Sequence, residues 1–77
     1  MNVNKTQAVM YILMILLRKG EIRKDEIMSV IDLSDLSFRR YLQEIRAFFI
    51  NFDLPYELRY SREDDSYKLY NDRDINI

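Results

Sequence analysis

Residues 27–45 read IMSVIDLSDLSFRRYLQEI, and this stretch decides the predicted fold. Ile27, Val30 and Ile31 follow the i, i+3, i+4 spacing that is typical of the buried face of an α-helix. A polar break at residues 32–34 separates this pattern from a second and longer one. The stretch therefore predicts two helices that are joined by a tight corner.

The corner is predicted at residues 32–34, and Ser34 is the expected N-cap of the helix that follows. Asp35 then lies in the first helical turn, where its negative charge interacts favourably with the helix dipole. Asp32 can adopt the left-handed conformation that such a corner often needs, although less readily than glycine. An N-cap at Ser37 is the competing register, and we favour Ser34 because it gives the shorter corner.

The helix after the corner is predicted over residues 35–50, and its side chains divide between two faces. At 100° per residue, one face is apolar and is expected to lie in the core: Phe38, Tyr41, Leu42, Ile45, Phe48 and Phe49. The opposite face carries arginines and is expected to meet solvent or a ligand: Leu36, Arg39, Arg40, Gln43, Arg46 and Ala47.

Two further helices are predicted before the corner. The first covers residues 6–19, with Thr6 as its N-cap and Gly20 as its left-handed stop. Residues 21–23 alternate between polar and apolar side chains and fit a short strand. The second helix covers residues 24–31 and ends at the corner.

A β-hairpin is predicted after the last helix. Residues 56–61 alternate apolar and polar side chains as a half-buried strand does, residues 62–66 form a polar turn, and residues 67–70 form the return strand. Residues 1–5 are then an arm and residues 71–77 a tail. The expected fold class is mainly α with a small β-hairpin, and the whole chain forms one domain.

Composition excludes several classes of function. The chain has 77 residues, which suits a single small domain. It contains no cysteine and no histidine, so disulfides, zinc sites, catalytic thiols and imidazole bases are excluded. No pattern of a nucleophile with a base is present either. We therefore expect no enzyme activity, no bound metal and no cofactor.

The longest apolar run indicates a cytoplasmic protein. Residues 10–17 read MYILMILL, which is far short of the roughly 20 residues that span a bilayer. A signal peptide would have positive charges before such a run, whereas Arg18 and Lys19 follow it. No membrane association is expected.

The arginine-rich face predicts binding to double-stranded DNA. Arginine can bond a guanine edge or a phosphate, and glutamine can pair with adenine, so Arg39, Arg40 and Gln43 are suited to read a duplex. The full set of expected DNA-contacting residues is Leu36, Ser37, Arg39, Arg40, Gln43 and Arg46. The alternative is an ordinary solvated helix face. The net charge of −1 is unusual for a DNA-binding domain, so the prediction depends on where the charges lie.

The pattern resembles the N-terminal winged helix-turn-helix domain of DeoR-type and WYL-domain bacterial transcription regulators. In that family the second helix ends in a Leu-Gly-Val-Ser corner, and the third carries Thr, an aliphatic residue, Arg and spaced aliphatic residues. The positions that match here are residues 31–34, Ser37, Phe38, Arg40, Leu42 and Ile45. The resemblance covers about residues 6–70. It implies three helices plus a wing, and a small DNA-binding regulator such as a repressor.

Three departures from the family pattern bear on function. Asp32 replaces the glycine of the corner, and a short insertion around residues 50–53 precedes the hairpin. The hairpin turn at residues 62–66 is acidic and lacks glycine, whereas a wing that contacts phosphates should be basic. The alternative function is therefore a protein-interaction module that uses the acidic hairpin and the apolar first helix. The large sensor domain of longer regulators is absent, so the sequence is either a free-standing small protein or a fragment.

The first helix is expected to form a homodimer interface. Residues 8–17 carry no polar side chain other than a tyrosine hydroxyl, although a helix on the surface of a small domain should have a polar face. The residues assigned to this interface are Val9, Met10, Tyr11, Leu13, Met14 and Leu17. The alternative is that the helix lies centrally and is covered by the hairpin and the helix after the corner.

Overall fold

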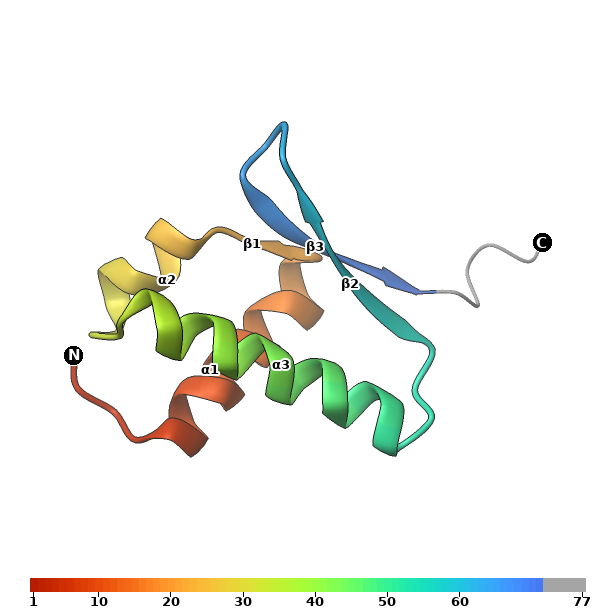
Figure 1. Ribbon diagram of the computed structural model, residues 1–77, viewed down its shortest axis with the longest axis horizontal. Coiled ribbons are helices and arrows are strands. Elements are labelled where there is room, and N and C mark those ends of the chain that lie inside the picture. The colour runs from red at the N-terminus through yellow and green to blue at the C-terminus, as the bar shows by residue number, and fades with distance from the viewer. Residues whose placement is uncertain (72–77) are drawn as a thin grey trace.

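The computed structural model describes residues 1–71 as three helices and a three-stranded antiparallel sheet (Figure 1). In chain order the elements are α1 (Lys5–Lys19), β1 (Glu21–Ile22), α2 (Lys24–Val30), α3 (Asp35–Asn51), β2 (Tyr56–Ser61) and β3 (Ser66–Asn71). The predicted helices and hairpin are therefore present, and the short strand after the first helix is confirmed. Most of the predicted tail, residues 72–77, lies outside the described residues.

Local capping residues set the ends of α1. The side chain of Asn4 accepts a hydrogen bond from the amide of Gln7 at 2.8 Å, so the predicted cap at Thr6 is wrong and the arm covers residues 1–4. Both residues are good caps, and a cap at Asn4 lengthens the helix by two residues. Gly20 ends the helix in the left-handed region with φ of 79°, as predicted, and its amide bonds the Leu16 carbonyl at 2.8 Å.

The corner between α2 and α3 differs from the prediction in its backbone. Ile31 is extended, with φ of −119°, and the non-glycine residues with positive φ within residues 1–71 are Asp53 and Asp65 rather than Asp32. The amide of Asp32 instead donates a hydrogen bond to the carbonyl of Met1 at 2.9 Å, so the N-terminal arm supplies an acceptor for this amide of the corner. No left-handed residue is then needed at this point.

The sheet has the order β1-β3-β2, with β3 in the centre. Leu58 of β2 lies opposite Leu69 of β3, and Ile22 of β1 lies opposite Tyr67. The return strand of the hairpin was predicted over residues 67–70 and is one residue longer at each end, because Ser66 and Asn71 also belong to β3. In Figure 1 the hairpin rises above the three helices, and its turn points away from them.

The core lies between the three helices and the sheet. Its buried residues come from five of the six elements: Ile12, Leu16, Ile22, Ile27, Phe38, Leu42, Ile45, Phe49 and Leu58. The predicted core positions Phe38, Leu42, Ile45 and Phe49 are confirmed, each at most 3% exposed. Phe48 was placed in the core wrongly, since it is 39% exposed at the border of the apolar face. Within residues 1–71, no helix has the length and apolar character that crossing a membrane requires.

Candidate nucleic-acid interface

The N-terminus of α3 is fixed by polar contacts that the corner supplies. The side chain of Ser34 accepts a hydrogen bond from the amide of Ser37 at 3.1 Å, which confirms the predicted N-cap. Lys24, at the start of α2, forms an ion pair with Asp35 at 3.3 Å. The first turn of α3 is therefore held both to its own cap and to the preceding helix.

Four side chains form one exposed face of α3. Leu36, Arg39, Arg40 and Gln43 follow the i, i+3, i+4, i+7 spacing that places residues along one side of a helix, and all four are exposed. Leu36 is 56% exposed, a high value for a large apolar residue near a helix start. Neither arginine forms an ion pair with any residue in the range 1–71. The face therefore presents two available guanidinium groups, one amide and one apolar side chain. We call these four residues the arginine face.

The other two residues predicted to contact DNA are engaged within the protein. The hydroxyl of Ser37 accepts a hydrogen bond from the hydroxyl of Ser34 at 3.1 Å, and Ser37 is half-buried. Arg46 is also half-buried, and its Nη2 donates to the carbonyl of Leu58 on β2 at 3.3 Å. Ser37 thus belongs to the cap of α3, and Arg46 joins α3 to the hairpin.

A cleft of about 440 Å³ lies beside the arginine face. Its lining residues come from the starts of α2 and α3 and from both strands and the turn of the hairpin: Lys24, Phe38, Arg39, Tyr60, Asp65 and Tyr67. The rings of Tyr60 and Tyr67 lie side by side, with centroids 5.0 Å apart. Sequence reasoning missed Lys24 and Tyr60 as neighbours of Arg39, because only the docking of the hairpin brings them together.

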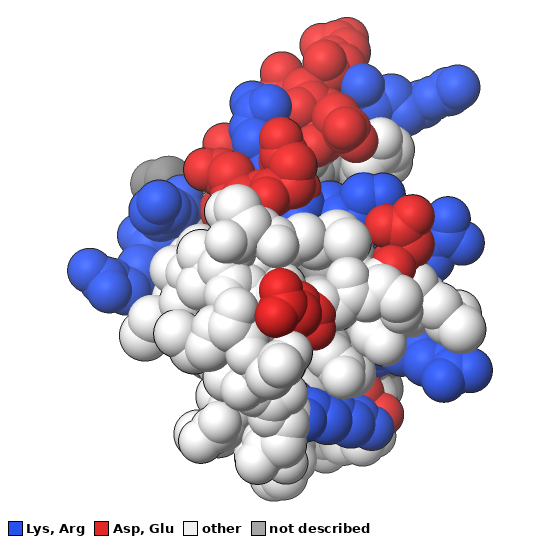
Figure 2. Space-filling view, turned by 90° about the vertical axis from the view of Figure 1, so that its left-hand side faces the viewer, with Lys and Arg blue, Asp and Glu red and all other residues white. Residues whose placement is uncertain are grey.

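The hairpin turn is less strongly acidic in three dimensions than its sequence suggests. Asp64 forms an ion pair with Lys68 and accepts a hydrogen bond from it at 2.5 Å. Asp65 accepts a hydrogen bond from the hydroxyl of Tyr60 at 2.7 Å. Residues 62–68 hold three acidic and two basic side chains, which leaves a net charge of −1. Figure 2 shows the acidic groups gathered at the hairpin end, at the top, with basic groups beside them.

These contacts shift the pKa values of the groups at the turn. The hydrogen bond from Lys68 lowers the pKa of Asp64 and raises that of Lys68 itself. The hydrogen bond to Asp65 is the main reason that the pKa of Tyr60 is raised. Near neutral pH, Asp64 is therefore a paired carboxylate, and Tyr60 is a neutral donor. The turn contains one further acid, Glu63, which is exposed.

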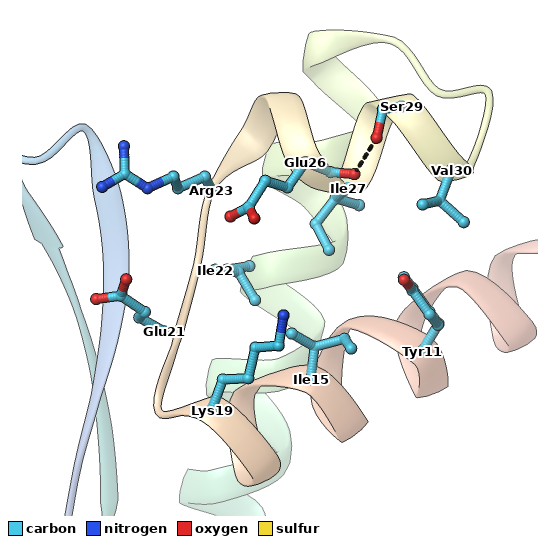
Figure 3. A pocket seen from close by; sticks show the side chains of 10 residues that line it. All are labelled: Tyr11, Ile15, Lys19, Glu21, Ile22, Arg23, Glu26, Ile27, Ser29 and Val30. Carbon is cyan, nitrogen blue, oxygen red and sulfur yellow. Dashed lines mark hydrogen bonds between the residues drawn. The ribbon is translucent and has the colours of Figure 1, made fainter.

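A separate hollow of about 270 Å³ lies between α1, β1 and α2 (Figure 3). Its walls are apolar near Ile15, Ile22 and Ile27 and charged near Glu21 and Glu26. The one hydrogen bond drawn there runs from the Ser29 hydroxyl to the Glu26 carbonyl, at 2.7 Å, and belongs to the helix backbone. Within residues 1–71, no three acidic side chains lie close enough together to hold a metal ion. The lining residues include none from α3, so the hollow is separate from the arginine face.

The six residues predicted for a dimer interface fall into two groups. Met10, Met14 and Leu17 are exposed by 63%, 42% and 52%. Val9, Tyr11 and Leu13 are half-buried against the core, and Tyr11 lines the hollow between α1 and α2. The exposed face of α1 is therefore narrower than predicted, but it is apolar.

Comparison with models of known protein families, with curated proteins and with solved structures found no match to this chain. The chemistry of the arginine face can therefore be judged from its own residues. Guanidinium and amide groups at this spacing donate hydrogen bonds to anionic oxygens and to base edges. The apolar Leu36 adds a contact that a thymine methyl group could accept.

Proposed function

We propose that this chain is a winged helix-turn-helix domain that binds double-stranded DNA through α3 as a small transcription regulator. The observation that carries the proposal is the arginine face, a continuous exposed row on the helix after a capped corner. Its two guanidinium groups form no ion pair within residues 1–71. The order of elements supports it, because a helix, a short strand, two helices and a hairpin follow each other along the chain. The pairing of β1 with β3 holds the hairpin against the helices.

Each residue of the arginine face has its own role in this proposal. Arg39 and Arg40 bond guanine or phosphate oxygens, and Gln43 pairs with adenine in the major groove. Leu36 lies in the first turn of α3, where base contacts of a recognition helix concentrate, and touches a thymine methyl group. Together they supply the base contacts, and backbone contacts come mainly from the two arginines.

The hairpin has a supporting role in the proposal. Its turn carries a net negative charge, so phosphates would be repelled there. Arg46 and Ser37 are already bonded to Leu58 and Ser34, and we assign them to holding α3 in place rather than to phosphate contacts. The wing therefore orients α3, and its turn stays off the duplex.

The test is selection from a random duplex library with the 77-residue chain, followed by affinity measurements on the enriched site. We expect an enriched sequence whose binding weakens steeply with salt. Arg40→Ala and Gln43→Ala should each weaken binding by about 1–3 kcal/mol and relax preference at one base position. Arg18→Ala is the matched control, because Arg18 is exposed at the end of α1 and should leave specificity unchanged. Unchanged affinity in both α3 variants would refute the role of the arginine face.

A second candidate function is a protein-interaction module. It is favoured by the net charge of −1 and by the exposed Glu63 at the hairpin turn. This alternative predicts no duplex binding at physiological salt and a stable complex with a protein that presents a basic surface. A library selection without enrichment would therefore favour it.

A further inference from the structure

The exposed side of α1 has the spacing of a helix-packing seam. Gln7, Met10, Met14 and Leu17 are exposed and are separated by three, four and three residues, which is the a and d spacing of a coiled coil. At 100° per residue, this seam lies roughly 180° from the fully buried side of the same helix. That buried side is formed by Ala8, Ile12 and Leu16. α1 thus has two packing faces, and within residues 1–71 the fold covers only one of them.

The apolar surface continues from α1 onto the end of α3. A groove of about 260 Å³ joins the two helices, lined by Val9, Met10, Leu13, Glu44, Ile45 and Phe48. The rings of Phe48 and Phe52 lie with centroids 5.2 Å apart, and Phe52 is 67% exposed. The charge in the groove is Glu44, which is paired with Lys5 at 3.2 Å.

The exposed apolar area matches what a homodimer needs. Five large residues are 39–67% exposed on this surface: Met10, Met14, Leu17, Phe48 and Phe52. Their exposed fractions equal about two and a half side chains, or roughly 500 Å² at about 200 Å² for each. A standard interface buries about 800 Å² per partner, and about 65% of a homodimer interface is apolar. The apolar share of such an interface is therefore also roughly 500 Å².

We propose that a second copy of the chain covers this surface, with the two α1 helices packed antiparallel about a two-fold axis that passes between the two seams at the level of residue 12. Because α1 covers Lys5–Lys19, antiparallel pairing centred on Ile12 overlaps the whole helix. Met10 then lies opposite Met14 of the partner subunit, and Leu17 lies opposite Gln7 of the partner subunit.

A second copy fits this surface better than a charged or irregular partner. The seam has no charged residue, so it offers nothing to select a charged partner, and its regular spacing is complementary to itself. An antiparallel two-fold also brings Phe48 of each subunit to the same side of the paired helices. The arginine face lies elsewhere on α3, so the dimer leaves it uncovered and does not depend on the proposed DNA binding.

The first test is the mass of the 77-residue chain in solution without DNA, measured by sedimentation equilibrium at tens of micromolar. We expect a dimer, and Met14→Glu should weaken it by at least about 100-fold, because a carboxylate would be buried without a partner. Ile50→Glu is the matched control: Ile50 is 77% exposed on α3 but lies outside the seam. A monomeric wild-type chain, or a Met14→Glu variant that stays dimeric with native circular dichroism, would overturn the proposal.

The second test fixes the orientation, and the absence of native cysteine makes it clean. Met10→Cys and Met14→Cys chains are mixed and oxidised. The antiparallel arrangement predicts mainly mixed disulfides between the two variants, because those positions lie opposite each other. A parallel arrangement would join two copies of the same variant by a disulfide, and this result would contradict the proposal. Arg40→Ala should remain dimeric, so a failure of DNA binding can be distinguished from a failure of dimerisation.

Discussion

The exposed faces of α1 and α3 are each formed by four side chains and differ in chemistry. Both helices bury one side against the same core, and both leave the other side to solvent. The free side of α1 consists of Met10, Met14 and Leu17 with one polar residue, Gln7. The free side of α3 carries Arg39, Arg40 and Gln43. Covering an apolar surface with another apolar surface lowers the free energy of the system. A guanidinium group is stabilised instead by hydrogen bonds to an anion. The comparison suggests that the two helices serve different partners.

The largest effect is expected from a substitution in the shared core, because unfolding removes the exposed faces of both helices. Phe38 is fully buried, and its ring packs edge-on against Tyr67 with centroids 5.7 Å apart. Phe38→Ala should lower the free energy of unfolding by about 3–5 kcal/mol, because it leaves a cavity at the base of α3. Urea denaturation followed by circular dichroism measures this change. Phe52→Ala is the control, since Phe52 is 67% exposed and its loss should have little effect on the monomer.

A crossed pair of variants tests whether the two faces are independent. Arg39→Ala with Arg40→Ala should lower DNA affinity and reduce the salt dependence of binding by about two released counterions, with no change in oligomer mass. Met14→Glu should change the oligomer mass and leave the salt dependence per subunit unchanged. Fluorescence anisotropy at several salt concentrations and sedimentation supply the two readouts. If either variant changed both readouts, the faces would be coupled.

The cap of α3 should have an intermediate effect. Ser34→Ala removes the acceptor for the amide of Ser37 and should lower the free energy of unfolding by about 1 kcal/mol. The same measurement on Ser29→Ala is the control, because the Ser29 hydroxyl only bonds a carbonyl inside α2. DNA affinity should also fall in Ser34→Ala, since the arginine face begins two residues after the cap. Equal stability of the two variants would show that the corner is held by other contacts.

The smallest effect is expected at the hairpin turn, as a dependence on pH. Lys68 holds the pKa of Asp64 below its usual value of 3.8, so the ion pair stabilises the turn above that pH. This contribution is lost as the pH falls through the lowered pKa. Lys68 has a raised pKa, so its share is present below pH 10.5 and is lost at more alkaline pH. Chemical shifts of the turn amides between pH 2 and pH 6 report the acid transition, and Asp64→Asn should abolish it.

Local periodicity was enough to predict much of α3 and its surroundings. Ser34 as a cap, Gly20 as a stop and the buried positions of α3 depend on residues within a few turns, so the sequence pattern contains them. The exposure of Arg39 and Arg40 also follows from the helical register that the Ser34 cap sets. The same reasoning failed at Phe48, because the width of an apolar face depends on how closely α1 packs against it.

Contacts between distant segments could not be predicted from the sequence. Arg46 and Leu58 are 12 residues apart, and their hydrogen bond exists only because the hairpin folds back on α3. The N-terminal arm meets Asp32 in the same way, which removes the need for a left-handed residue at the corner. At the turn, the acidic composition was evident, but the pairing of Asp64 with Lys68 requires the register of β3.

The hydrogen bond between Arg46 and Leu58 has a consequence for aggregation. β2 is the longer of the two edge strands of the sheet, and its outer edge is a template on which a strand of another molecule could add. The Arg46 guanidinium occupies the carbonyl of Leu58 in the middle of that edge, so an incoming strand would have to displace a cation. The β2 edge is thus protected against edge-to-edge growth.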